Sequence, residues 1–236
     1  MALKTPFHII FAAAYSYACY WNICIGRQLI EAGLSQKLPF PRFFLHLTSW
    51  NVGLNAVYFT LKSLKLASSK KSKTFFFGIL GPMSLIVCFY FWALMFNDPK
   101  NLSSGKKRAF FPVIYSHLSH TTQFFSTVLE LIFYSSEASS SATNDKTKIR
   151  YKFFRSKIHY FSMIMPLLYF TWALYIRFEF GEWVYPFLKI LWNSKNHAYF
   201  HLLFVGTCVL YSFIGWALSG LHDMMVSEDD DGKKEK

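Results

Sequence analysis

Six long apolar blocks run through the sequence, and their length decides what the chain can fold into. Each block spans about 18 to 25 residues, which is the length that a helix needs to cross the hydrocarbon core of a bilayer, about 30 Å thick. Polar or basic connectors separate the blocks, which cover residues 8–25, 41–64, 74–96, 112–134, 158–178 and 199–219. The pattern predicts an all-α polytopic membrane protein, a bundle of about six transmembrane helices.

The composition argues against a soluble fold. Of the 236 residues, 53% are hydrophobic and only 16% are charged, whereas about a quarter of the residues in a soluble domain are charged. No internal repeat is visible and no connector is long enough for a second globular domain. We therefore expect one membrane domain over residues 1–222 and a charged tail over residues 223–236. The four cysteines lie inside apolar blocks and show neither a disulfide framework nor zinc spacing.

The formal net charge of +12 is spread over short connectors, which argues against a nucleic-acid partner. Connectors on the side of the N-terminus carry 15 Lys and Arg residues, and those on the opposite side carry 10. The positive-inside rule then predicts that both termini are cytoplasmic. The sequon at residues 101–103 would lie on the opposite, lumenal side.

The chain ends in Lys233-Lys234-Glu235-Lys236, which resembles the dilysine retrieval signal of endoplasmic reticulum membrane proteins. We therefore expect the endoplasmic reticulum membrane, with the plasma membrane as the alternative. The lysines are equally well explained as a solvated charge run at a chain end.

The second and fourth blocks are the poorest membrane spans because polar side chains interrupt them. At 100° per residue, Thr48, Asn51 and Asn55 share one face of the second helix. The fourth helix has one polar face as well, made by Ser116, His117, His120, Gln123, Thr127 and Glu130. Since lipid offers such groups no partner, the two faces are expected to meet or to line one cavity.

Thr48 and His120 are expected at the same depth in the membrane. If the two helices begin at Pro41 and Pro112, a rise of 1.5 Å per residue puts Thr48 roughly 10 Å and His120 roughly 12 Å along them. A threonine hydroxyl needs a base to become a nucleophile, and neutral imidazole suits that task. The alternative is that these groups only hydrogen-bond between helices, the commonest role of such residues in membrane bundles.

Nucleophilic catalysis also requires a group that orients the histidine and donors for the developing oxyanion. The candidates for this supporting shell share the two polar faces with Thr48 and His120. They are Asn51, Asn55, His117 and Gln123.

Four short motifs give the chain a family resemblance. They are LT at 47–48, NAVYF at 55–59, HLSHTT at 117–122 and WVYPFL at 183–188. Together they are similar to the androgen-induced gene family, whose members are six-helix membrane proteins that act as threonine hydrolases on fatty acid esters of hydroxy fatty acids. The resemblance covers most of the chain.

The resemblance implies that Thr48 is the nucleophile and His120 the essential histidine of a lipid ester hydrolase without a cofactor, acting on a lipid ester among membrane lipids. The chain departs from the family at Asn51, where the family has an acidic residue, and at Ser116, where it has asparagine. We expect the shell around the pair to differ accordingly. The WVYPFL segment, at the membrane end where Thr48 begins its helix, is expected either to cap the cavity or to anchor the chain at the interface.

Two other functions remain open at this stage. One is a non-enzymatic membrane regulator or transporter that uses the polar cavity for binding. The other is a metal or haem oxidoreductase with ligands among His46, His117, His120 and His201, although no HExxH motif or carboxylate-rich cluster is present.

Overall fold

The computed structural model describes residues 4–35, 37–66, 69–97, 110–139, 146–193 and 198–234. Within these ranges the chain is helical and contains no strand, which confirms the predicted all-α fold. The predicted sequon at residues 101–103 lies outside them, as do residues 235 and 236 of the dilysine pattern.

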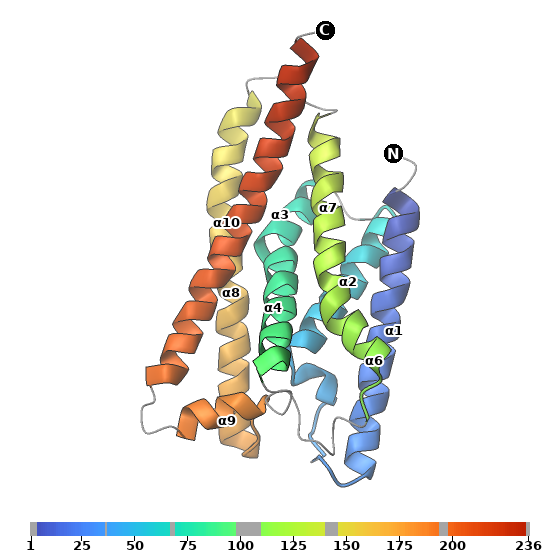
Figure 1. The fold of residues 1–236 in the computed structure, drawn as a ribbon, viewed down its shortest axis with the longest axis vertical. Coiled ribbons are helices and arrows are strands. Elements are labelled where there is room, and N and C mark those ends of the chain that lie inside the picture. The colour runs from blue at the N-terminus through green and yellow to red at the C-terminus, as the bar shows by residue number, and fades with distance from the viewer. Residues whose placement is uncertain are drawn as a thin grey trace.

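The described helices form six segments that run alternately up and down the bundle (Figure 1). In chain order the segments are α1 (Lys4–Glu31); α2 (Leu47–Ser63), preceded by the short 3-10 helix η1 (Arg42–Phe44); α3 (Ser69–Phe75), the π-helix η2 (Phe76–Leu80) and α4 (Gly81–Asn97); α6 (Val113–Ser116), the π-helix η4 (His117–Thr121) and α7 (Thr122–Ser139); α8 (Lys146–Phe180); and α10 (Ala198–Lys234). The short helix α9 (Pro186–Asn193) connects α8 to α10. The N-terminal end of α1 and the C-terminal end of α10 lie at the same end of the bundle, and α9 lies at the other.

The expected start of the second helix is wrong. Pro41 has an extended backbone (φ −58°, ψ 134°) and only precedes the single turn of η1. His46 is extended as well (φ −102°, ψ 138°), and this breaks the hydrogen-bonding pattern between η1 and α2. The helix therefore begins at Leu47. The expected start of the fourth helix is close, because Pro112 directly precedes α6.

The connector between the fourth and fifth apolar blocks is helical in its described residues. The helix α7 continues to Ser139 and α8 begins at Lys146. The tail expected from residue 223 is also continuous with the last helix, because α10 runs to Lys234. These helices extend beyond the apolar blocks, so apolar length alone underestimated them.

The exterior of the bundle is apolar and its interior is partly polar. Ile9, Ile10 and Phe125 are more than half exposed, whereas Asn51 and Gln123 have no exposed surface. This distribution is the reverse of that in a soluble protein, and it suits a bundle surrounded by lipid.

Three helices are long and apolar enough, by length and composition, to cross a membrane within the described residues: Lys4–Glu31, Lys71–Asn97 and Ala198–Met225. The polar second and fourth segments are not among them. The helix α2 has only 17 residues and is too short, and inward-facing polar side chains lower the mean hydropathy of the fourth segment.

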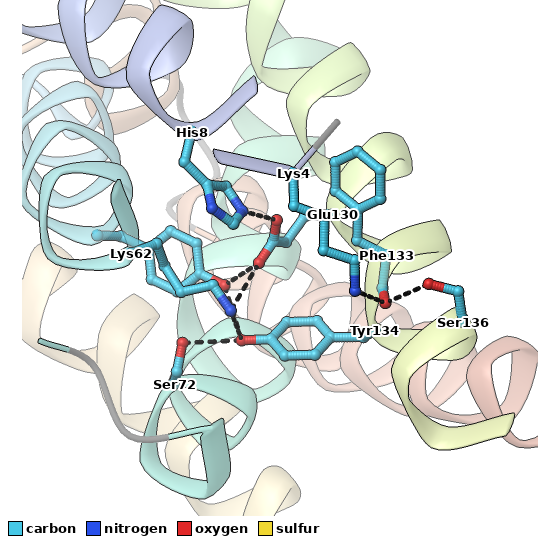
Figure 2. A network of polar contacts seen from close by, with 9 residues as sticks. Lys4, His8, Lys62, Ser72, Glu130, Phe133, Tyr134 and Ser136 are labelled. Atoms are coloured by element: carbon cyan, nitrogen blue, oxygen red, sulfur yellow. Dashed lines mark hydrogen bonds and ion pairs between the residues drawn. The ribbon is translucent and has the colours of Figure 1, made fainter. Parts of the chain in front are cut away.

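A buried ionic cluster lies at the end of the bundle where the chain begins (Figure 2). The Glu130 carboxylate of α7 accepts a hydrogen bond from the Tyr58 hydroxyl of α2 (2.6 Å) and pairs with His8 Nε2 of α1 (2.9 Å) and Lys62 Nζ of α2 (3.4 Å). The Glu130 side chain is only 1% exposed. One carboxylate thus joins α1, α2 and α7.

The Tyr134 hydroxyl extends this cluster to α3. It lies 2.8 Å from the hydroxyls of both Tyr58 and Ser72, and it accepts a hydrogen bond from Lys62 Nζ at 3.4 Å. Glu130 is ten residues beyond His120, or roughly 15 Å along a helix. The polar face of the fourth segment therefore contributes to two separate clusters, one around His120 and one around Glu130. The Glu130 cluster is the structural one.

We predict that Glu130→Gln lowers the thermal midpoint of the protein in detergent by several degrees. The substitution removes the anion that faces Lys62, and a buried charge left without its partner costs on the order of 1–3 kcal/mol here. Thermal unfolding of the purified variant measures the effect, with Glu179→Gln on the exposed surface of α8 as the matched control. Equal midpoints for the wild type and Glu130→Gln would show that the cluster does not stabilise the bundle.

Candidate active site

Thr48 is the second residue of α2, at the opposite end of this helix from Tyr58 and Lys62 of the ionic cluster. The extended backbone of His46 ends the preceding connector, and its side chain does not cap the helix. Ser49 N–H and Trp50 N–H donate to the His46 carbonyl, which leaves the amide groups of Leu47 and Thr48 for other partners. The positive end of the helix dipole lies beside the Thr48 hydroxyl.

His120 belongs to the π-helix η4, where the wider turn interrupts the regular α-helix. Its Nε2 lies 3.4 Å from Thr48 Oγ1. The structure thus brings together the two residues that the sequence paired. The distance is at the long end for a hydrogen bond, as is common for a nucleophile and its base in the absence of substrate.

The partners of the other ring nitrogen fix which tautomer His120 adopts. His120 Nδ1 lies 2.9 Å from both the Ser116 carbonyl oxygen and Ser119 Oγ. The Ser119 hydroxyl donates its hydrogen to the Tyr115 carbonyl at 2.8 Å, so it can only accept from the ring. We assign the proton to Nδ1, which leaves the lone pair of Nε2 facing Thr48.

The His120 ring is held on its face as well. Phe91 of α4 stacks against it with 3.7 Å between ring centroids and an angle of 16° between the planes. A ring with a fixed plane and a fixed tautomer needs little reorganisation before it accepts a proton.

Tyr185, in the connector between α8 and α9, completes the surroundings of Thr48. Its hydroxyl interacts with the side chain and the backbone N–H of Thr48, the backbone N–H of Leu47 and the side chain of Tyr169. Its ring also lies 5.3 Å from that of His46. Burial raises the pKa of Tyr185, so the phenol keeps its proton at neutral pH.

All four residues expected in the supporting shell have other partners. Gln123 Nε2 donates to the Ser119 carbonyl at 2.5 Å. Asn55 Nδ2 donates to Asn51 Oδ1 (3.1 Å) and to Ser84 Oγ of α4 (3.2 Å), so these two asparagines join α2 to α4. His117 is exposed, and its Nδ1 contacts Thr121 Oγ1 at 3.2 Å. None of these interactions reaches the ring of His120.

Two buried amide atoms near the pair lack a hydrogen-bond partner among the described residues. They are Asn51 Nδ2 and Gln123 Oε1. Each residue lies three positions after a member of the Thr48–His120 pair, and neither has exposed surface. A donor and an acceptor left unsatisfied at this depth are suited to a substrate group or a water molecule.

Three residues of the site were not singled out by the sequence. Phe91 and Tyr185 are described above, and Asn22 of α1 is the third. Asn22 Nδ2 donates to Ser49 Oγ (2.8 Å) and to the Tyr115 hydroxyl (2.7 Å), and so fixes the start of α2 against α6. Only Tyr185 had a signal in the sequence, because it lies in the WVYPFL motif.

The comparison with protein families gives a match over nearly the whole chain. The model of the FAR-17a/AIG1-like protein family covers residues 3–218, which include Thr48, His120 and Tyr185. The chain belongs to this family. The match confirms the resemblance to the androgen-induced gene family, whereas comparisons with curated proteins and with solved structures gave no match.

The two departures of this FAR-17a/AIG1-like chain from the family pattern differ in their effect on the site. Ser116 accepts from His120 through its backbone carbonyl, so the identity of its side chain does not affect that hydrogen bond. Asn51 is an uncharged amide in a buried cluster with Asn55 and Ser84. An acidic residue there would place a charge inside the bundle, about one helical turn from Thr48.

No group of three or more His, Cys, Asp and Glu side chains that could hold a metal ion is found in the described part of this FAR-17a/AIG1-like chain. His46 packs against Tyr185 with tilted rings and His120 stacks on Phe91, so two of the histidines considered as ligands have other partners.

Proposed function

We propose that the protein is an intramembrane lipid ester hydrolase in which Thr48 is the nucleophile and His120 is the general base. The observation that carries the proposal is the position of the His120 Nε2 lone pair 3.4 Å from Thr48 Oγ1. The family resemblance supplies the substrate class, fatty acid esters of hydroxy fatty acids, which are apolar enough to enter the site from the bilayer.

In the first half of the reaction Thr48 Oγ attacks the carbonyl carbon of the ester while its proton passes to His120 Nε2. The resulting imidazolium is stabilised because Nδ1–H continues to donate to the Ser116 carbonyl. The tetrahedral intermediate then collapses. The bond to the hydroxy fatty acid oxygen breaks, and His120 returns its proton to that leaving oxygen.

In the second half a water molecule attacks the acyl-threonine. His120 Nε2 accepts a proton from this water, and the bond between Thr48 Oγ and the acyl carbon breaks as Oγ regains a proton from the ring. The products are one fatty acid and one hydroxy fatty acid, and the resting pair is restored. No cofactor enters either half.

The Tyr185 hydroxyl and the first amide groups of α2 are the donors that we assign to the oxyanion. The backbone N–H groups of Leu47 and Thr48 lie near the Tyr185 oxygen, so all three groups lie beside the nucleophile. The helix dipole favours negative charge at the same place. Donors that are fixed before the reaction stabilise the transition state without further reorganisation.

The proposal includes a location for the chemistry. We place the chain in the endoplasmic reticulum membrane with six passes and both termini in the cytoplasm, as the charge distribution favours. The start of α2 then lies toward the lumenal side. A site within the first helical turn is within reach of water for the second half-reaction, while the acyl chains remain in lipid.

We predict that Thr48→Val and His120→Ala each lower ester hydrolysis at least about 10³-fold, because each removes one member of a pair that acts as a unit. Thr48→Ser retains a hydroxyl and should keep measurable activity. Labelling of the purified protein with a fluorophosphonate probe should likewise be strongest for the wild type, measurable for Thr48→Ser and lowest for Thr48→Val and His120→Ala. The assays use detergent-solubilised full-length protein.

Thr60→Val on the same helix and His201→Ala on the surface of α10 are the matched controls, and both should behave as the wild type. Hydrolysis retained by Thr48→Val would exclude the mechanism. A wild-type protein that neither labels nor hydrolyses esters would favour the non-enzymatic regulator.

A separate prediction concerns Tyr185→Phe, which removes only the hydroxyl. We expect kcat to fall about 10²-fold, because one oxyanion donor is lost, while KM stays within about twofold. Steady-state kinetics on one ester measures both constants. Tyr175→Phe on the exposed side of α8 serves as the control. An unchanged kcat would show that Tyr185 is not an oxyanion donor.

The orientation is tested by epitope tags at the two termini. After selective permeabilisation of the plasma membrane, antibodies should reach both tags, and a lumenal marker should stay protected. Protection of either tag would contradict the proposed topology.

A further inference from the structure

A cavity of about 520 Å³ lies between the second half of α1 and the connector that leads into α2. Cavities of this size are typical of small-molecule sites. The wall from α1 includes Asn22, Ile23, Arg27 and Ile30, and the opposite wall is formed by residues 37–43. The cavity lies beside the proposed active site and belongs to none of the interactions described above for catalysis.

Three cationic side chains line this cavity: Arg27, Lys37 and Arg42. Arg42 forms an ion pair with Glu182 (3.5 Å), and its Cβ packs on Gly26, so its stem is part of the wall. Arg27 and Lys37 are exposed, and neither has an acidic partner among the described residues. Two positive charges are therefore left for a ligand.

The remaining lining is mostly apolar. Ile23 and Ile30 of α1 face Leu38 and Phe40 of the connector across the cavity. A cavity that joins unpaired cations to an apolar wall suits an amphipathic anion, with its charge at the cations and its chain along the wall.

Two contacts connect the cavity to Thr48. Asn22 lines the cavity and donates to Ser49, the residue next to Thr48. Phe43, on the opposite wall, packs so closely on Gly53 of α2 that a Cβ at that glycine would lie 2.9 Å from the Phe43 ring. The cavity therefore borders the first turns of the helix that carries the nucleophile.

We infer that this cavity binds the free carboxylate end of the substrate, so that the enzyme selects esters that carry an unesterified long-chain carboxylate. The inference rests on the proposed function and adds to it the group that Arg27 and Lys37 recognise. A carboxylate at these cations extends its chain along the apolar wall toward Thr48, where the internal ester reacts. An ester whose carboxylate is blocked lacks this interaction.

The kinetic test compares one fatty acid ester of a hydroxy fatty acid with its methyl ester. The double variant Arg27→Gln/Lys37→Gln should raise KM for the free acid about 10- to 100-fold, the range expected for losing charge-assisted hydrogen bonds. Hydrolysis of the methyl ester should not change. Lys189→Gln on the exposed side of α9, at the same end of the bundle, is the matched control. Equal KM values for the double variant and the wild type would overturn the inference.

A binding test separates this inference from the proposed chemistry. Thr48→Val protein in nanodiscs of neutral phosphatidylcholine should bind a fluorescent long-chain fatty acid, and Arg27→Gln/Lys37→Gln in the Thr48→Val background should bind it at least tenfold more weakly. This result would support the cavity even if hydrolysis failed. Unchanged binding would overturn the inference, as would displacement of the fatty acid by phosphatidylserine at equal concentration, because the cavity would then be a phospholipid headgroup site.

Discussion

Lipid offers no hydrogen-bond partner, and this constraint decides how the polar groups of the bundle are arranged. Within the described residues the polar interior is divided between two ends. At one end Glu130 joins three helices through His8, Tyr58 and Lys62, and its hydrogen bonds and ion pairs satisfy it. At the other end the groups around Thr48 are only partly satisfied, since Asn51 Nδ2 and Gln123 Oε1 lack hydrogen-bond partners. The end at which Glu130 has its hydrogen bonds and ion pairs suits a structural role. The end at which buried polar atoms lack hydrogen-bond partners suits the binding of a ligand.

The sequence predicted the bundle because membrane helices have a simple signature of length and apolarity. It also paired Thr48 with His120, although one premise was wrong. The helix begins at Leu47 and not at Pro41, so Thr48 lies in its first turn. The error did not separate the pair, because His120 Nε2 still lies 3.4 Å from Thr48 Oγ1. The same correction gives Thr48 the amide groups of a helix start, which a position in the second turn would have lacked.

The rest of the site depends on contacts between distant segments. Tyr185 lies well over 100 positions from Thr48 in the chain, and Phe91 stacks on His120 from a helix with no polar signal. The π-helix that contains His117 and His120 has no signature in the sequence either, and it alters the 100° spacing on which the polar face was drawn. His117, expected beside His120, is exposed for this reason. Helical periodicity predicted which face was polar, and tertiary packing decided which polar groups meet.

The proposed chemistry needs water and lipid at one place, and a site at the start of α2 would meet both requirements. A nucleophile at the bilayer centre would reach the ester but would have no water for the second half-reaction. A nucleophile in a loop would have water but no apolar wall for the acyl chains. Thr48 lies in the first turn of a helix that enters the bundle, beside a connector that carries cationic and apolar side chains. The helix that is poorest as a membrane span therefore offers the nucleophile both the polar donors of its first turn and access to a lipid substrate.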